Sequence, residues 1–289
     1  MSFSLAPSAI SPAPSMTLAR SLPQGVDELS QMGPLELFKS QMETGSTEAK
    51  VDAMKRLPVV GFAMGASDTV KLLLPYLQTF TFQQPPAEDE LLLLLAKQLQ
   101  TFLPLLLVQP LDIMELVPIL ERLASVEETV VREQAVVAMN HLCVTLCGKT
   151  DTLDPSISTN LLSMVKRLVG ADWFTAKVSA AGMLPGLYTV TKQPELVHLS
   201  RELCLDETPM VRRSASQYLG DFFCKLASKE KVQELIPVLQ QLCKDEQDSV
   251  RMLAVASLAQ VGDAYGKSPE WTKEYFLPLL KEGSTDLSW

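Results

Sequence analysis

The chain has 289 residues, of which 47% are hydrophobic, so it can bury a large core as one elongated repeat domain or about two globular domains. Its formal net charge is −9 and its isoelectric point lies near 4.9. These values argue against a nucleic-acid partner, because binding of phosphates needs clustered Lys and Arg side chains.

The first 33 residues are rich in Ser, Pro and Ala and show no hydrophobic period. This composition predicts a disordered tail over 1–33. A mitochondrial transit peptide is the alternative, because residues 1–26 contain no acid, but Arg20 is their only basic residue and such peptides are rich in Arg. The N-terminus lacks the basic segment followed by an apolar core that marks a secretory signal.

From Pro34 onward, helix-forming residues with apolar side chains at helical spacing predict successive pairs of helices. The Leu-rich stretch 91–108 does not read as a membrane span, because Lys97, Gln98 and Pro104 interrupt it and a spanning helix needs about 20 nearly continuous apolar residues. We therefore expect no membrane association. The expected pairs cover roughly 34–64, 68–108, 112–148, 155–191, 194–227, 230–266 and 269–289.

Four of these segments share one internal spacing. Residues expected near the start of the first helix precede a basic residue of the second helix by 14 positions, and successive basic residues lie 45, 35 and 39 positions apart. A period of about forty with a fixed offset is typical of an array of two-helix repeats. The four combinations are Pro118 with Arg132, Ser163 with Lys177, His198 with Arg212, and Pro237 with Arg251.

Apolar-Pro-x-Leu units such as Val117-Pro118-Ile119-Leu120 recur in the first helices. Proline suits a first helical turn, where its missing N–H costs nothing, and this predicts that each helix begins there. If residues precede the proline in the helix, a kink is expected instead. The offset from Pro278 points beyond Trp289, so we expect the last repeat to be incomplete and the chain to be a shortened form.

Acidic residues and Ser or Thr mark the turns within the pairs, as in Glu127-Glu128-Thr129 and Asp206-Glu207-Thr208. Such side chains accept hydrogen bonds from the free N–H groups at the start of the following helix and suit its positive end. The turns are therefore predicted to cap the second helices.

Catalytic and metal-binding patterns find little support. The five cysteines form no CxxC pair, and Cys143 and Cys147 have only His141 nearby, so we expect buried, reduced thiols in a cytoplasmic or nuclear protein. His198 occupies a repeat position and reads as structural. With no glycine-rich phosphate loop, HExxH or GxSxG, we expect neither an enzyme nor a cofactor.

One repeat carries a complete pattern of Pro237, Asp245, Val250 and Arg251, which resembles the HEAT motif. In the third and fourth repeats Val126 and Ala171 replace the Asp. The resemblance implies an all-α fold, a right-handed α-α superhelix (solenoid) of about six to seven HEAT repeats over residues 34–289.

The turns are more specific than the period. Segments 125–132, 172–175, 206–213 and 245–251 resemble the scaffold A subunits of protein phosphatase 2A (PP2A), in the order and at the spacing of that family. The resemblance implies a non-catalytic platform whose turns bind interchangeable regulatory B subunits. The catalytic subunit would bind repeats farther toward the C-terminus, which we expect to be absent here. HEAT arrays also serve as adaptors and nuclear-transport receptors, and the fold alone does not decide between these functions.

Two sets of residues follow from the repeats and the resemblance. The first is expected to contact a partner: Glu127, Glu128, Trp173, Glu207, Pro209, Met210, Arg213, Glu246, Asp248 and Trp289. The second is expected to link neighbouring repeats as a ladder of charges: Arg132, Lys177, Asp206, Arg212, Asp245, Arg251 and Asp286.

Three aromatic and basic positions define these expectations most sharply. Trp173 is expected to be displayed, because interface hot spots favour Trp and Arg, whereas Phe174 is expected in the core. Arg213 lies beside a ladder position that Arg212 fills, and is expected to form a salt bridge to a partner.

Overall fold

The computed structural model describes residues 32–84, 86–106, 110–148, 153–226, 229–265 and 269–284. Every regular element in these ranges is helical, as the sequence predicted. The expected N-terminal tail lies outside the described residues except for its last two positions, and so do Asp286 and Trp289.

The repeating unit is a pair of helices packed against each other. The first helices of the pairs are α2 (Pro34–Thr44), α5 (Ala66–Asp68) with η1 (Thr69–Leu73) and α6 (Leu74–Thr81), η2 (Pro110–Leu116) with α8 (Val117–Leu123), α10 (Pro155–Val169), α12 (Glu195–Cys204), α14 (Lys229–Leu242), and α16 (Pro269–Trp271) with η3 (Thr272–Phe276) and α17 (Leu277–Gly283). The second helices are α3 (Thr47–Lys55) with α4 (Leu57–Met64), α7 (Asp89–Leu106), α9 (Thr129–Cys147), α11 (Phe174–Thr191), α13 (Pro209–Lys225) and α15 (Asp248–Tyr265).

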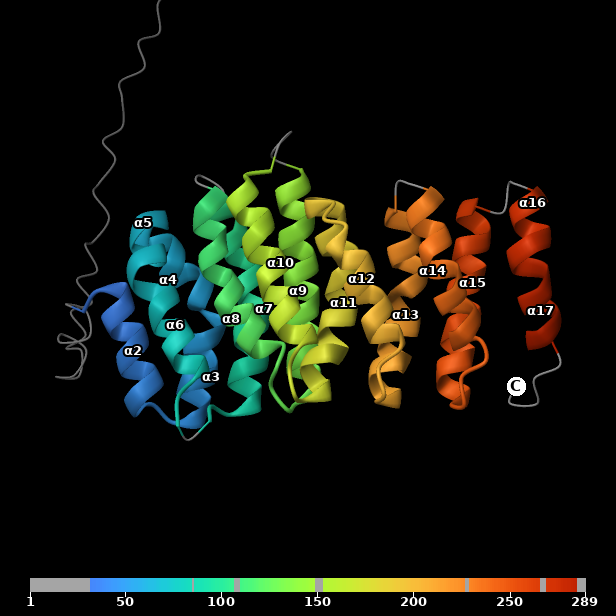
Figure 1. Cartoon of the computed structure of the whole chain (residues 1–289). Helices are drawn as coiled ribbons and strands as arrows, with labels where there is room; N and C mark the ends of the chain where they lie inside the picture. The colour runs from blue at the N-terminus through green and yellow to red at the C-terminus, as the bar shows by residue number, and fades with distance from the viewer. Residues whose placement is uncertain are drawn as a thin grey trace, which may run out of the picture.

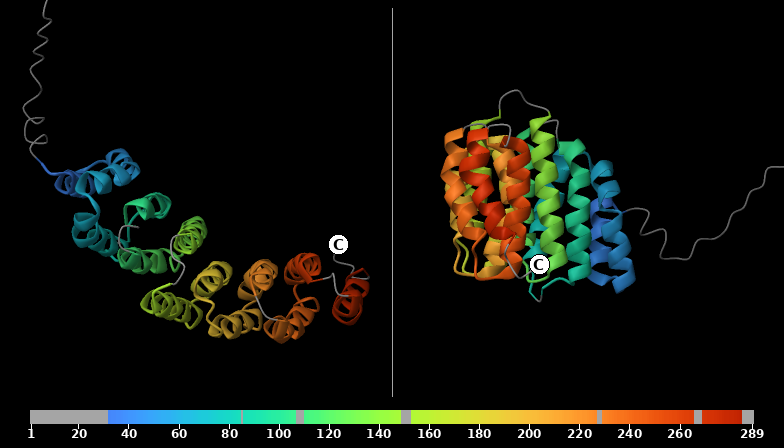
Figure 2. Two further views of the ribbon diagram at one scale, coloured as in Figure 1. Left: turned by 90° about the horizontal axis from the view of Figure 1, so that it is seen from above. Right: turned by 90° about the vertical axis from the view of Figure 1, so that its right-hand side faces the viewer.

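The pairs stand side by side in a row whose N-terminal and C-terminal repeats lie at opposite ends (Figure 1). Seen along the helix axes, the row is curved, with α9, α11, α13 and α15 on its inner side and α8, α10, α12 and α14 on its outer side (Figure 2, left). The turns inside the pairs line the lower edge of Figure 1. The curved row of stacked pairs is a solenoid.

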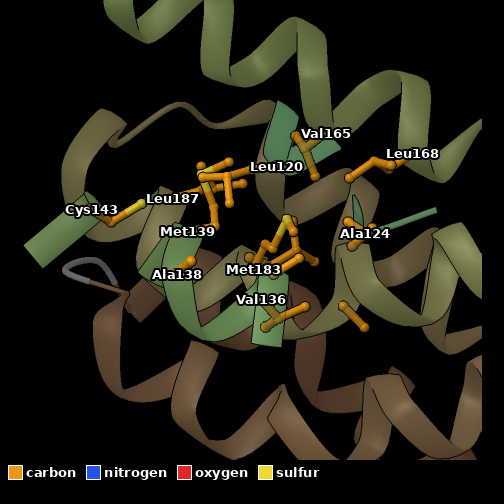
Figure 3. Close-up of a cluster of buried hydrophobic side chains, with 14 of the residues drawn as sticks. Leu120, Ala124, Val136, Ala138, Met139, Cys143, Val165, Leu168, Met183 and Leu187 are labelled. Atoms are coloured by element: carbon orange, nitrogen blue, oxygen red, sulfur yellow. The ribbon is translucent and has the colours of Figure 1, made fainter. Parts of the chain in front are cut away.

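One hydrophobic cluster runs through the described array from Phe38 to Leu279. Figure 3 shows its section between the third and fourth pairs, where Leu120 and Val165 of the outer helices meet Met139 and Met183 of the inner helices. Because each pair completes the core of the next, no pair buries its apolar face alone.

The prolines of the first helices do not lie where the sequence predicted. Pro75, Pro118, Pro237 and Pro278 follow earlier helical residues, so they lie inside the helices and not at their start. The missing proline N–H is accommodated by a π-turn before Pro75 and Pro278 and by a 3-10 segment before Pro118. The same correction applies to the other two offset positions, Ser163 and His198, which lie within α10 and α12.

The Leu-rich stretch became α7, whose apolar side chains are largely buried in the core. Within the described residues, no single helix is both long and apolar enough to cross a membrane. The segments Leu57–Met64 and Ala66–Thr81 reach the required length and composition only together, and a bend of 117° separates them.

Small residues let the inner helices approach one another closely. The amide of Asn140 on α9 donates to the carbonyl oxygen of Gly182 on α11 (3.1 Å). Between α13 and α15, the Ser257 hydroxyl donates to the carbonyl oxygen of Ser216 (2.6 Å) and accepts from the N–H of Gly220 (3.0 Å). At Gly182 and Gly220, such close contact between one helix backbone and the next helix requires a position without a Cβ.

Gly220→Ala is expected to destabilise the fold, because the added Cβ would lie 2.9 Å from Ser257 Cα and would overlap Gln260 Oε1. Overpacking of this kind costs about 1–3 kcal/mol. Thermal unfolding followed by circular dichroism measures the loss. The control is Gly262→Ala inside α15, whose added Cβ meets no atom within 4 Å and is expected to stabilise the helix by roughly 0.5–1 kcal/mol. Equal effects of the two changes would contradict the packing argument.

Candidate functional site

The turns inside the third to sixth pairs, residues 124–128, 170–173, 205–208 and 243–247, follow one another along one edge of the array (Figure 1). We call these turns, with the first turns of α9, α11, α13 and α15, the ridge. The core fixes the spacing of the helices and therefore the spacing of the turns, so side chains of the ridge form a line. An open hollow lies between the fifth and sixth turns, lined by residues that include Asp206, Arg212 and Asp245.

An arginine closes each of three ridge turns. Arg212 Nη1 donates to the carbonyl oxygens of Asp206 (3.1 Å) and Glu207 (3.0 Å) in its own turn. Arg132 and Arg251 make the corresponding pair of bonds to the carbonyl oxygens of their own turns. These carbonyl groups precede the helix and have no helical partner, so the arginine fixes the entry of the chain into each inner helix.

The aspartates accept hydrogen bonds from N–H groups of the turns, and not from the first N–H groups of the inner helices as the sequence predicted. Asp206 Oδ1 accepts from the N–H of Thr208 (2.8 Å), and Asp245 Oδ1 accepts from the N–H of Gln247 (2.9 Å). Both N–H groups precede the inner helices, and neither Thr208 nor Glu128 caps its helix with its side chain. The prediction that these turns cap the helices was wrong at these positions, because the acids form Asx-type turns instead.

The second carboxylate oxygen of each aspartate accepts a hydrogen bond from a basic side chain of the preceding repeat. Lys177 Nζ donates to Asp206 Oδ2 (2.8 Å), and Arg212 donates from Nε to Asp245 Oδ2 (2.7 Å) and from Nη2 to Oδ1 (3.1 Å). Burial alone would raise the pKa of Asp245, but the bonds from Arg212 and the Gln247 N–H outweigh it and lower that pKa. The same balance, with Lys177 as donor, lowers the pKa of Asp206.

The ladder is not continuous. Ala171 stands at the position of the aspartate in the fourth turn, and Arg132 makes no ion pair there. Arg132 is 7% exposed, and its Nε has no hydrogen-bond partner. At the other end, Arg251 Nη2 bonds Asp248 Oδ1 (2.6 Å) within its own helix, and its expected partner Asp286 lies outside the described residues.

The apolar residues expected at the partner surface are exposed. The Trp173 side chain is 76% exposed and Met210 is 51% exposed. Phe174 is 39% exposed, which corrects the expectation that it belongs to the core: it begins α11, and the buried face of that helix starts at Ala176. Pro209 is the first residue of α13 and Arg213 is exposed one turn later.

The acidic residues divide into two groups. Glu127 and Glu207 are exposed, and Glu128 is half-buried. Glu246 accepts from Arg212 Nη2 (3.2 Å), and Asp248 pairs with Arg251, although both carboxylates remain largely exposed. Trp289 lies outside the described residues.

The structure also reveals links that the spacing did not predict. Arg167 on α10 binds the carboxylate of Glu121 on α8 through Nε and Nη2, both at 2.7 Å. His198 Nδ1 lies 3.3 Å from Glu234 Oε1 on α14, in keeping with its structural reading. Both pairs join consecutive outer helices. The available signal is a pair of opposite charges on the first helices of neighbouring repeats, whereas the basic residues that define the period lie on the inner helices.

The remaining reactive side chains are dispersed. Among the described residues no three His, Cys, Asp or Glu side chains are arranged to hold a metal ion. Burial raises the pKa of the Cys143 and Cys204 thiols to about 12, so both stay protonated. The expectation of uniformly buried thiols was wrong for Cys147 and Cys224, which are exposed.

Comparisons with known proteins agree with this geometry. A model of the HEAT repeat matches residues 235–265. The chain is 30% identical over 270 residues to the regulatory A subunit of protein phosphatase PP2A from Schizosaccharomyces pombe, covering 92% of this chain and 44% of that protein. It is 36% identical over 192 residues to the PP2A 65 kDa regulatory subunit of Drosophila melanogaster, covering 65% and 31%. This chain is a homologue of the PP2A regulatory A subunits.

The A-subunit homologue spans less than half the length of these curated relatives. The solved structures that resemble it share little sequence identity with it. A designed armadillo repeat protein aligns over 80% of this chain and all of its own, with 16% identity and a TM-score of 0.39. An engineered protein aligns over the same shares, with 14% identity and a TM-score of 0.44.

Asp245→Asn is expected to lower the stability of the A-subunit homologue at pH 7 by about 1–3 kcal/mol, because it weakens charge-assisted bonds between two repeats. The folded-state pKa of Asp245 is lowered, so its contribution is complete above the unfolded value of about 3.9 and is lost as the pH falls through the folded value. Urea denaturation at pH 7, 5 and 3 should therefore show the difference from wild type shrinking on acidification.

The matched control is Asp52→Asn, which removes an exposed carboxylate 3.6 Å from Lys55 within one helix. Such surface pairs contribute about 0–1 kcal/mol. If Asp245→Asn and Asp52→Asn have the same effect at pH 7, the ladder does not stabilise the array.

Proposed function

We propose that this chain is a non-catalytic scaffold subunit of a PP2A serine/threonine phosphatase complex, and that its ridge binds a regulatory B subunit. The observation that carries the proposal is the Trp173 side chain, which is 76% exposed on the ridge. A large apolar ring left in water by its own repeat is favourable to bury in an interface, where Trp and Arg dominate binding energies. Homology to named regulatory A subunits over 92% of the chain supports the same conclusion.

The chemistry beside Trp173 defines the expected contacts. Met210 offers a flexible apolar surface at the next position along the ridge, where α13 begins, and Arg213 offers a guanidinium without an ion pair in the described residues. The exposed carboxylates of Glu127 and Glu207 give the ridge an acidic character. A B subunit with a basic surface and an acidic group opposite Arg213 would complement this pattern.

The scaffold mechanism is geometric. Each repeat contacts only its neighbours, so partners bound at different turns are held at a separation set by the intervening repeats, and small rotations per repeat add along the row. On this proposal the chain works in the cytoplasm or nucleus. The five cysteines, none of which forms a disulfide, are consistent with those compartments.

Trp173→Ala is expected to weaken binding of a purified recombinant B subunit by about 30-fold or more, because it removes a central aromatic anchor. Arg213→Ala is expected to weaken it about fivefold through loss of a charge-assisted contact. Calorimetry or biolayer interferometry measures the affinities, and circular dichroism verifies that helix content is unchanged.

The control for both variants is Phe62→Ala, which removes an aromatic ring that is 55% exposed on α4, away from the ridge. It is expected to leave the affinity unchanged. Binding of Trp173→Ala as tight as that of Phe62→Ala would exclude the ridge as the partner surface.

A further inference from the structure

The same type of charged pair recurs at two junctions between repeats. In the fourth and fifth repeats the basic residue of the inner helix meets an aspartate of the next turn, in the pairs Lys177–Asp206 and Arg212–Asp245. That aspartate stands six positions before the basic residue of its own repeat. The position therefore presents a carboxylate to the preceding repeat.

Ala171 occupies this position at the junction of the third and fourth repeats. Arg132 Nη1 nonetheless donates to the corresponding two carbonyl groups of its own turn, as Arg212 Nη1 does, while Arg132 Nη2 donates to Thr129 Oγ1 of its own helix (3.0 Å). In Arg212 this orientation directs Nε to the next turn, where it meets Asp245 Oδ2 at 2.7 Å. Arg132 holds the corresponding position in the third repeat, and the following turn has Ala171 where an aspartate would stand.

Arg132 Nε is a buried donor without a partner, in a residue that is only 7% exposed. Burial lowers the pKa of Arg132, while the nearby carboxylates of Glu128 and Glu133 oppose the shift. An unsatisfied charged donor of this kind gains more from one correctly placed acceptor than an exposed donor does.

We infer that the ladder position at Ala171, which lacks an acid and which we call the gap, receives the carboxylate of an Asp or Glu side chain from the protein that docks on the ridge. Arg132 Nε is the donor to this carboxylate. This inference rests on the proposed function and names one contact of the B subunit. Trp173 lies two residues from Ala171, so a partner segment that covers the indole also reaches the gap. The partner would supply the acid that the array supplies at the next two junctions.

Access to the gap follows from the same difference between junctions. Ion pairs close the junctions on the C-terminal side, at Asp206 and Asp245, whereas no such pair joins Arg132 to the fourth turn. At this junction the ion pair joins Glu121 and Arg167 on the outer helices, and Asn140 bonds Gly182 between the inner helices, so among the described residues no ion pair links the third turn to the fourth turn itself. A side-chain carboxylate suits the space better than a phosphate group, because the matching positions hold a single Asp side chain.

Ala171→Asp provides the test, because it places the missing carboxylate within the chain. The variant is expected to raise the melting temperature by closing the ladder and to weaken binding of a purified recombinant B subunit by about tenfold or more, because it occupies the donor that the partner needs. Ala171→Asn is the matched control: it has nearly the same size without the charge, and its effect on binding is expected to be clearly smaller.

The outcomes separate the two proposals. A raised melting temperature with unchanged affinity would show that Arg132 binds a carboxylate at this position but that the B subunit does not provide one. This result would overturn the inference and leave the proposed function intact. Equal losses of affinity for Ala171→Asp and Ala171→Asn would attribute the effect to bulk, and would also overturn it. Absence of binding by folded wild-type chain would overturn the proposed function and the inference with it.

Discussion

Close packing of the inner helices is the constraint on which the rest of this structure depends. Where Gly220 lies against Ser257, a bare backbone meets the next helix, and side-chain hydroxyls satisfy the polar groups that this contact buries. The inner row is therefore compact, the outer row carries the larger links such as Arg167 with Glu121, and the array curves toward the inner side (Figure 2). Because the spacing of the inner helices is fixed, their turns are brought into register along one edge, and the ridge results from packing rather than from any preference of the turns themselves.

The charged side chains of the ridge bond both within their own turn and to a neighbouring repeat, because the packing brings the turns close together. Each aspartate of the ladder accepts one bond from the N–H of its own turn and at least one from a basic side chain of the preceding repeat, and each arginine uses one nitrogen for its own turn. These charges are paired within the array, whereas Trp173 and Arg213 remain exposed for the contacts proposed for a partner. The same bonds keep the turns rigid, and a preorganised surface loses less conformational entropy when a partner binds.

Much of this arrangement could be predicted from the sequence, and the errors have physical causes. The constant offset between first-helix residues and basic residues predicted the repeat array, because the stack requires one residue type at one place in every unit. The apolar-Pro-x-Leu units misplaced the helix starts: Pro75 and Pro118 show only that one N–H is missing, and π-turns and 3-10 segments tolerate that inside a helix. Exposure of Phe174 could not be read from its type, because the first turn of an inner helix projects beyond the core. The vacant position at Ala171 was visible in the sequence, but its meaning required the orientation of Arg132.

The charged pairs of the ladder differ from one junction to the next, so they depend on the order of the repeats. Lys177 meets Asp206 and Arg212 meets Asp245 only because the fourth, fifth and sixth repeats follow one another in that sequence. If the fifth repeat were joined directly to the third, Asp206 would come to Arg132 and close the vacant junction, while a second copy of the fourth repeat would set Ala171 opposite Lys177 and open a new one. The modules of this array are thus alike in fold but not interchangeable, and recombination at their boundaries would relocate the junction that lacks its acid.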